Sequence, residues 1–287
     1  MLEILKSILF GIVEGITEWL PVSSTGHLKL LNEFVNLQVS ADSTINEEFL
    51  SMYDVVIQLG AIIAVIVLFF HKLNPFAPSK KAEEKKNTWT LWIKVCAAII
   101  PSGVLGVLLD DWMETYLHNA VVISIALNDY GVPFMQVERR NSGKHMKVND
   151  VHAIGYKTAL LIGAFQCLSL IPGTSRSGST ILGAILLGVG RSAGAEFSCF
   201  MAIPTMLGAS AIKLLKYLKF LTETGFSMGG MKIGILLVGM VVSFVVSLLV
   251  IKGLMEYVRK HSFSAFGVYR IVLGAIVLGY FGIKALI

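Results

Sequence analysis

The sequence is poor in charged residues and in cysteine for its length. Only 15% of its 287 residues are Asp, Glu, Lys or Arg, whereas 55% are hydrophobic and the mean hydropathy is +0.73. Soluble domains contain about 25% charged residues, so this composition predicts a protein that crosses a membrane several times. Cys96, Cys167 and Cys199 lie in apolar segments without CxxC spacing, which argues against a disulfide framework and a cysteine zinc site. The N-terminus lacks a small-residue cleavage site after an apolar run, so no cleaved signal peptide is expected.

The basic residues indicate topology and not a nucleic-acid partner, although the net charge is +5. Lysine and arginine concentrate at 72–94, 138–157 and 252–260, while 110–119 contains acidic residues and neither lysine nor arginine. By the positive-inside rule, the basic segments lie in the cytoplasm, and 110–119 and both termini lie outside. Three lysines conflict with this scheme, because it places them near the outer face, against lipid headgroups: Lys213, Lys216 and Lys219.

The apolar runs predict an all-α polytopic membrane protein with about six transmembrane helices. A helix needs about 20 apolar residues to span the hydrocarbon core. Six runs reach or approach this length: 53–71, 91–109, 120–137, 196–215, 232–251 and 266–286. The third run contains Asn128, Asp129, Pro133 and Gln136, so it faces a polar interior, kinks or fails to cross.

Two further apolar segments, 1–29 and 158–189, are interrupted near their middle by proline, glycine, serine and threonine. Interrupted segments occur at membrane depth only where they are buried in protein or line a polar cavity. We therefore expect two broken, re-entrant helical hairpins.

Each half of the chain has one broken segment followed by three spans, which predicts an inverted repeat within a single membrane domain, 1–287. The expected halves are 1–137 and 158–287, joined by the basic cytoplasmic loop 138–157. Transporters of inverted design bind their ligands near the midplane, where such segments meet. Adding 152 to the residue number relates the two broken segments: Gly11 to Gly163, Glu14 to Gln166, Ser23 to Ser175, Thr25 to Ser177 and Gly26 to Gly178.

The first broken segment carries two acids, Glu14 and Glu18. At this spacing on a helix both carboxylates face the same side and repel, so inside a membrane they share a proton or bind a cation. Paired carboxylate oxygens suit Mg²⁺ or Ca²⁺. The alternative is a solvated helix face, which the surrounding apolar residues disfavour.

After Pro21, which ends a helix, the segment continues with small polar residues and a histidine: Ser23, Ser24, Thr25, Gly26 and His27. Hydroxyl side chains are favoured as N-caps of a following helix. Ser24 and His27, three residues apart, have a spacing that permits a nucleophile and base pair. The alternatives are that the hydroxyls are only caps and that His27 is a hydrogen-bonded core residue.

The interruption of the second broken segment, Pro172–Thr180, contains one arginine among serines and glycines. An arginine at bilayer depth is costly and therefore functional by default. The spacing of Gly173 and Gly178 resembles a P-loop, but the lysine and the preceding strand are absent, so nucleotide binding is not expected. We expect Arg176 and backbone N–H groups at a helix N-terminus to bind phosphate. An arginine that snorkels to the headgroups is the alternative, disfavoured by its position inside an apolar segment.

This combination of residues favours phosphoryl transfer on a lipid-borne substrate. The two acids, Ser24 and His27 lie on one side, and Arg176 and hydroxyls lie on the other. Acids alone would indicate an ion pathway. The main alternative from another class is a polyprenyl-phosphate transporter or flippase, because broken helices at the midplane are also transporter architecture.

The motifs Glu14-xxx-Glu18, Pro21–His27 and Pro172–Thr180 resemble the signatures of the bacterial undecaprenyl-diphosphate phosphatase family, BacA/UppP. The likeness covers nearly the whole chain and includes two further segments: Tyr53–Gly60 and Glu196–Ser198. It implies a plasma-membrane enzyme that hydrolyses undecaprenyl diphosphate to the monophosphate and phosphate, for peptidoglycan synthesis. It also implies bacitracin resistance, stimulation by a divalent cation, a site that faces the outer side, and interdigitated inverted repeats.

The resemblance further implies roles for individual residues. Glu14 and Glu18 hold a metal ion, Mg²⁺ or Ca²⁺, or assist proton transfer. Ser24 is the candidate nucleophile, activated by His27, while a metal-bound water is the alternative nucleophile. Arg176, Ser175 and Thr180 hold the diphosphate. The other residues that we expect to bind substrate are Ser23, Thr25, Gly26, Gly173 and Ser177. Membrane lipids are expected partners, and a homodimer is one possible assembly.

Overall fold

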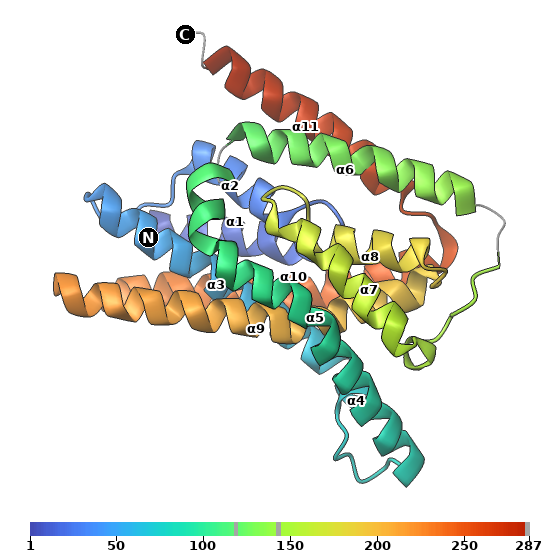
Figure 1. The fold of residues 1–287 in the computed structure, drawn as a ribbon. Coiled ribbons are helices and arrows are strands. Elements are labelled where there is room, and N and C mark those ends of the chain that lie inside the picture. Colours follow the sequence, from blue (N-terminus) through green and yellow to red (C-terminus); the bar gives the residue numbers. More distant parts are fainter. Residues whose placement is uncertain (118–119, 142–144, 285–287) are drawn as a thin grey trace.

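The computed structural model describes residues 1–117, 120–141 and 145–284, and this part of the chain contains helices and no strand (Figure 1). The helices before residue 142 are α1 (Leu2–Thr17), α2 (Ser24–Val35), α3 (Ser43–Leu68), α4 (Phe70–Leu73), α5 (Ala82–Leu117) and α6 (Ala120–Asn141). The remaining elements are η1 (Val151–Ala153), α7 (Tyr156–Gln166), η2 (Cys167–Leu170), α8 (Arg176–Leu186), α9 (Arg191–Thr224), α10 (Gly230–Lys260) and α11 (Ser264–Lys284).

Five of the described helices are long and apolar enough to cross a membrane: α3, α5 over Ala82–Leu109, α9, α10 and α11. This confirms the prediction of an all-α polytopic membrane protein. The remaining expected span, 120–137, is a continuous helix, α6, but it is not among the five. Its polar residues lower the hydropathy, and one of them, Asn128, donates to the Ser124 carbonyl at 3.0 Å within the same helix.

Segments expected as loops are partly helical. α5 continues to Leu117, through most of 110–119, and α6 continues to Asn141, into 138–157. The charges in these segments predict where a chain leaves the membrane, but charged residues are compatible with a helix. The helices therefore extend beyond the membrane boundary that the sequence indicates.

Both broken segments are interrupted where the sequence predicts, and the two breaks share one backbone conformation. Ser23 before α2 has φ 73° and Ser175 before α8 has φ 75°. Each serine caps the following helix, with Oγ accepting from Gly26 N at 3.4 Å and from Gly178 N at 3.1 Å. A capping hydroxyl satisfies a backbone N–H that has no partner within the helix. Ser23 and Ser175 therefore occupy equivalent structural positions in the two breaks, and so do Gly26 and Gly178.

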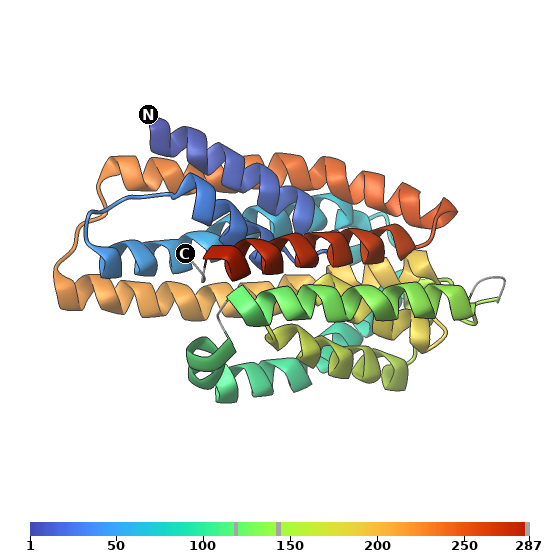
Figure 2. The same cartoon turned by 90° about the horizontal axis from the view of Figure 1, so that it is seen from above.

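The packing of the helices repeats one pattern twice. α1 packs against α10, and α7 packs against α5. α3 lies against α9, and α6 lies beside α11 (Figure 2). Two glycines allow the close approach of short and long helices: a Cβ on Gly11 would meet the Gly239 carbonyl at 2.6 Å, and one on Gly163 would meet the Ala98 carbonyl. An inverted repeat produces this pairing, and the boundaries of its two halves stay a prediction.

The two broken segments enter the molecule from opposite ends. In Figure 1, α1 runs inward from the left end, where the N-terminus lies, and α7 runs inward from the right. Their breaks meet inside the bundle, where Ser177 Oγ lies 3.1 Å from the Leu20 carbonyl. The fold therefore joins the two predicted motifs in one place.

Candidate active site

A cavity of about 160 Å³ lies between the two breaks. Seven of its lining residues were expected at the site: Glu18, Ser23, Ser24, Thr25, Gly173, Ser175 and Arg176. Gly173, with φ 94°, supplies a turn that a side chain would strain. The sequence motifs from the two halves thus form opposite walls of one polar cavity.

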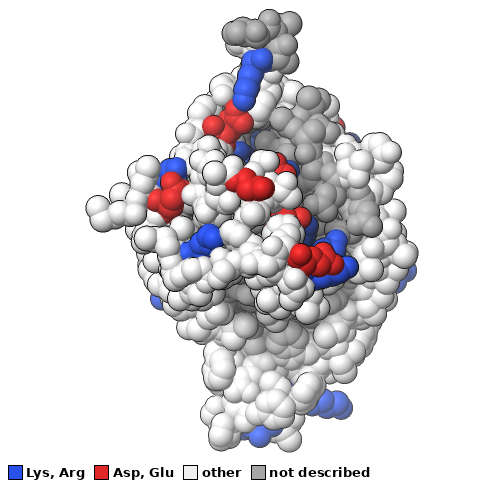
Figure 3. Space-filling model, turned by 90° about the vertical axis from the view of Figure 1, so that its left-hand side faces the viewer, with Lys and Arg blue, Asp and Glu red and all other residues white. Residues whose placement is uncertain are grey.

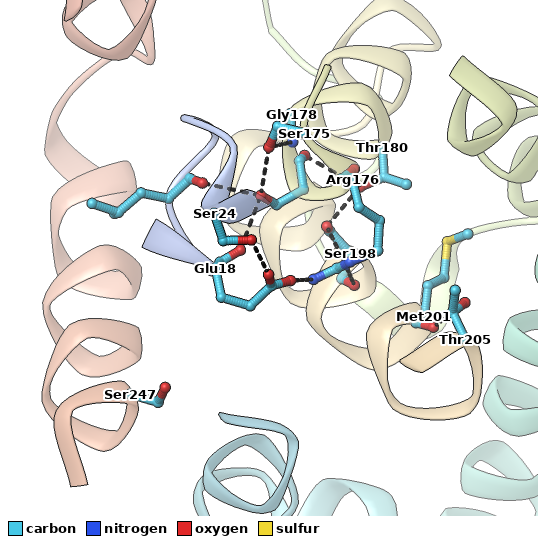
Figure 4. A network of polar contacts seen from close by, with 12 residues as sticks. Glu18, Ser24, Ser175, Arg176, Gly178, Thr180, Ser198, Met201, Thr205 and Ser247 are labelled. Atoms are coloured by element: carbon cyan, nitrogen blue, oxygen red, sulfur yellow. Dashed lines mark hydrogen bonds and ion pairs between the residues drawn. The ribbon is translucent and has the colours of Figure 1, made fainter. Parts of the chain in front are cut away.

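Glu18 is the centre of the hydrogen-bond network in this cavity (Figure 4). Ser24 Oγ donates to Glu18 Oε2 at 2.6 Å, and Arg176 Nη2 donates to Glu18 Oε1 at 3.0 Å. Glu18 is only 6% exposed, so its charge needs the arginine as a partner. The Arg176 guanidinium also lies 5.8 Å from the centroid of the Trp19 ring.

Contacts with α9 hold the Arg176 side chain in place. Its Nη1 donates to the Ser198 carbonyl at 2.8 Å, and Ser198 Oγ lies 2.6 Å from Thr180 Oγ1. The buried Nε has no hydrogen-bond partner. A buried donor is unfavourable unless some group accepts from it.

Three expected substrate-binding residues do not line this cavity. Ser177 Oγ lies 3.2 Å and 3.1 Å from the carbonyls of Glu18 and Leu20, so it joins the second break to the first. Thr180 Oγ1 lies 2.9 Å from the Arg176 carbonyl, and Gly26 belongs to a neighbouring cavity. In this structure Ser177 and Thr180 support the site from behind.

The expected pair of Ser24 and His27 is not formed. Ser24 has Glu18 as its partner, whereas His27 Nδ1 lies 2.7 Å from the Ser23 carbonyl and His27 Nε2 lies 2.7 Å from Tyr269 Oη. The two rings also stack, with centroids 5.7 Å apart. The helical spacing of Ser24 and His27 allowed a contact, but the α1–α2 break turns Ser24 toward Glu18, six residues before it.

Glu14 lies deeper than Glu18 and has a different environment. It is 0% exposed, and neither carboxylate oxygen has a hydrogen-bond partner. Such a group is costly unless a proton or a cation neutralises it. The two unpartnered oxygens fit a hard divalent cation, whereas both oxygens of Glu18 are engaged. The described residues contain no cluster of three His, Cys, Asp or Glu side chains that could hold a metal alone.

Several residues of the site were not assigned a role from the sequence. Gln58, Ser169, Thr205 and Met206 also line the cavity. Gln58 lies in a segment that carries the family resemblance, so that signal could have found it. The other three lie on apolar stretches with no distinguishing pattern.

A second cavity, of about 600 Å³, adjoins the first, and the two share Thr25 and Gln58. Its apolar lining comes from five helices and includes Phe10, Leu28, Leu50, Ile123, Val277 and Phe281. Its charged lining includes Lys29, Asp54 and Lys213. Lys213, which conflicted with the topology scheme, therefore lines a cavity wall. Acidic and basic side chains are intermixed on the face seen from the left of Figure 1 (Figure 3).

Comparison with known proteins decides the family. Residues 7–276 match the model of the family described as bacitracin resistance protein BacA. The chain belongs to this family. An undecaprenyl-diphosphatase of Lactiplantibacillus plantarum is 53% identical over 281 residues, which cover 98% of each chain. Undecaprenyl-diphosphatase 1 of Clostridioides difficile is 54% identical over 281 residues, with 98% of this chain and 97% of that protein covered. The BacA family resemblance seen in the motifs is confirmed.

Proposed function

We propose that this chain hydrolyses undecaprenyl diphosphate to undecaprenyl phosphate and inorganic phosphate, which recycles the carrier lipid for cell-wall synthesis. The observation that carries the proposal is the position of Glu18 between Ser24 and Arg176. An acid that accepts from a serine hydroxyl, beside an arginine with a free donor, suits phosphoryl transfer. The names of the relatives point to the same reaction and do not favour the transport alternative.

In the proposed first step, Ser24 Oγ attacks the terminal phosphorus and its proton passes to Glu18 Oε2. The Oγ–P bond forms, the P–O bond to the leaving undecaprenyl phosphate breaks, and Arg176 neutralises charge on the transferred phosphoryl group. Water then attacks the phosphoserine, phosphate leaves, and Glu18 returns a proton to Ser24. This sequence assigns the base role to Glu18 in place of His27.

His27 then acts as a positioning residue. Its ring joins the Ser23 carbonyl to Tyr269 of α11, so it fixes the turn that presents Ser24. The capping bond from Ser23 to Gly26 holds the same turn.

A divalent cation, Mg²⁺ or Ca²⁺, remains part of the proposal. The unpartnered oxygens of Glu14 would be its ligands from this chain. When bound, it would offset negative charge on the diphosphate.

The two cavities suit different parts of the substrate, one polar and one apolar. The cavity at Glu18, about 160 Å³, suits the diphosphate and is too small for a long isoprenoid chain. The adjoining cavity, with Phe10, Val277 and Phe281 in its lining, suits the first isoprenoid units. We propose that the protein lies in the bacterial plasma membrane with this entrance on the outer side, since the basic segments indicate that the opposite end is cytoplasmic.

Phosphate release by purified protein from a defined polyprenyl diphosphate tests the function. Wild type releases phosphate, and Ser24→Ala, Glu18→Gln and Arg176→Ala lose it while they remain folded. Ser247→Ala is the matched control, because Ser247 is a buried α10 serine that contacts the Gly15 carbonyl outside the network (Figure 4). No phosphate release by wild type, with lipid transport in liposomes, would instead support the flippase alternative.

A further inference from the structure

Arg270, in the apolar helix α11, is a buried arginine to which neither the sequence motifs nor the proposed reaction gives a role. It is 0% exposed. Its Nη1 donates to the Pro21 carbonyl at 3.1 Å, and its Nη2 donates to the Gly173 carbonyl at 2.9 Å. One guanidinium therefore contacts both breaks.

The two carbonyls occupy equivalent positions in the two broken segments. Pro21 lies two residues before the capping serine Ser23, and Gly173 lies two residues before Ser175. Pro21 and Gly173 are also separated by the same 152 residues that relate the two serines. Arg270 thus binds both breaks at corresponding points.

The same side chain is anchored to α6. Nε donates to the Leu127 carbonyl at 3.3 Å, and Nη2 also donates to the Ala126 carbonyl at 3.2 Å. The guanidinium lies 5.6 Å from the centroid of the Tyr130 ring. The planar fork of an arginine suits several carbonyls at once, and here it is held by a helix pair that packs closely along its length.

The charge of Arg270 has no carboxylate partner among the described residues, in contrast to Arg176, which pairs with Glu18. Burial of a guanidinium against neutral carbonyls is expensive. A neutral amide would avoid that cost but has too few donors to reach four carbonyls. The number of donors, in one rigid plane, is what this position requires.

We propose that Arg270 is a positioning residue. It holds the two breaks in the relative position that catalysis needs, so that Ser24 and Glu18 face Arg176 across the cavity. This inference rests on the proposed function for its kinetic consequence. A shift of about 1 Å at a remote residue can lower a rate about 100-fold. The effect falls on kcat, because Arg270 lines neither of the two cavities near the site.

The test uses full-length protein in detergent and the variants Arg270→Gln and Arg270→Lys. We expect Arg270→Gln to lower kcat about 100-fold with KM within about threefold. Arg270→Lys, which keeps the charge and some donors, restores part of that loss. Hydrogen–deuterium exchange supplies a readout independent of activity: peptides covering 19–26 and 171–179 exchange faster together in Arg270→Gln.

Lys94→Gln is the matched control, because Lys94 is 7% exposed and donates to the His152 carbonyl at 3.0 Å, outside both cavities. It should leave kcat and both peptides unchanged. Unchanged kcat in folded Arg270→Gln, or faster exchange in only one break, would overturn the inference. If Arg270→Gln does not fold, the same measurements on Arg270→Lys decide. An inactive wild type would contradict the proposed function alone, since the exchange data still test Arg270.

Discussion

Ser24 donates its hydroxyl hydrogen to Glu18, with 2.6 Å between Oγ and Oε2. Glu18 is the C-cap residue of α1 and Ser24 is the first residue of α2, so the break between the two helices brings them together. Because Arg176 contacts the other oxygen of the same carboxylate at 3.0 Å, the three residues form one unit.

If Ser24 and Glu18 act as a unit, their substitutions are not additive. Ser24→Ala and Glu18→Gln should each lower kcat by about 10²–10⁴-fold, the usual contribution of a general base. The double variant should be scarcely slower than the worse single variant. Steady-state kinetics on the three variants measures this; a double variant slowed by the product of the two single effects would show independent roles.

His27 is expected to matter less than Glu18. It contacts the Ser23 carbonyl and Tyr269, and not Ser24, so its loss disturbs the turn and leaves the base in place. His27→Gln and Tyr269→Phe should each lower kcat by about tenfold or less. If His27→Gln were as slow as Glu18→Gln, while Tyr269→Phe kept full activity, His27 would be the base.

The cation requirement is expected to depend on Glu14. Its two buried oxygens have no other partner, so Glu14→Gln should abolish stimulation by Mg²⁺ or Ca²⁺ and leave the low activity insensitive to a chelator. Titration of chelator and cation against phosphate release measures this. Wild-type stimulation in Glu14→Gln would place the cation elsewhere.

The close contact of α1 with α10 predicts a stability effect. In Gly11→Ala the new methyl group would lie 2.6 Å from the Gly239 carbonyl, which should cost about 1–3 kcal/mol of unfolding free energy through overpacking. Thermal unfolding in detergent measures it. Gly103→Ala is the control, since a Cβ there meets nothing within 4 Å; alanine should be neutral or slightly stabilising at that helical position. Equal melting temperatures for both variants would contradict the packing.

The sequence predicts which segments form the site better than it predicts which residues contact one another there. Pro21 and the following serines interrupt a helix through local chemistry, so the breaks and their caps could be foreseen. The Ser24–Glu18 bond could not, because it crosses the break, where helical spacing rules no longer apply. Arg270 could not be assigned either. Its partners lie on three other segments, and only the folded chain brings Pro21 and Gly173 to α11.

The polar helix α6 is an element whose continuity the sequence could not predict. Its Asn128 and Pro133 signalled a departure from an ordinary span, but the sequence left open whether the helix was interrupted. In the structure the helix is continuous. Packing along α11 provides the contacts that compensate for its low hydropathy.

The stereochemical course at phosphorus tests the central claim most directly. A terminal phosphoryl group made chiral with oxygen isotopes would be hydrolysed by the wild-type protein, and the configuration of the product determined. Transfer through Ser24 involves two in-line displacements, so the account predicts overall retention of configuration. Inversion would mean a single attack by water and would contradict the role of Ser24 as nucleophile.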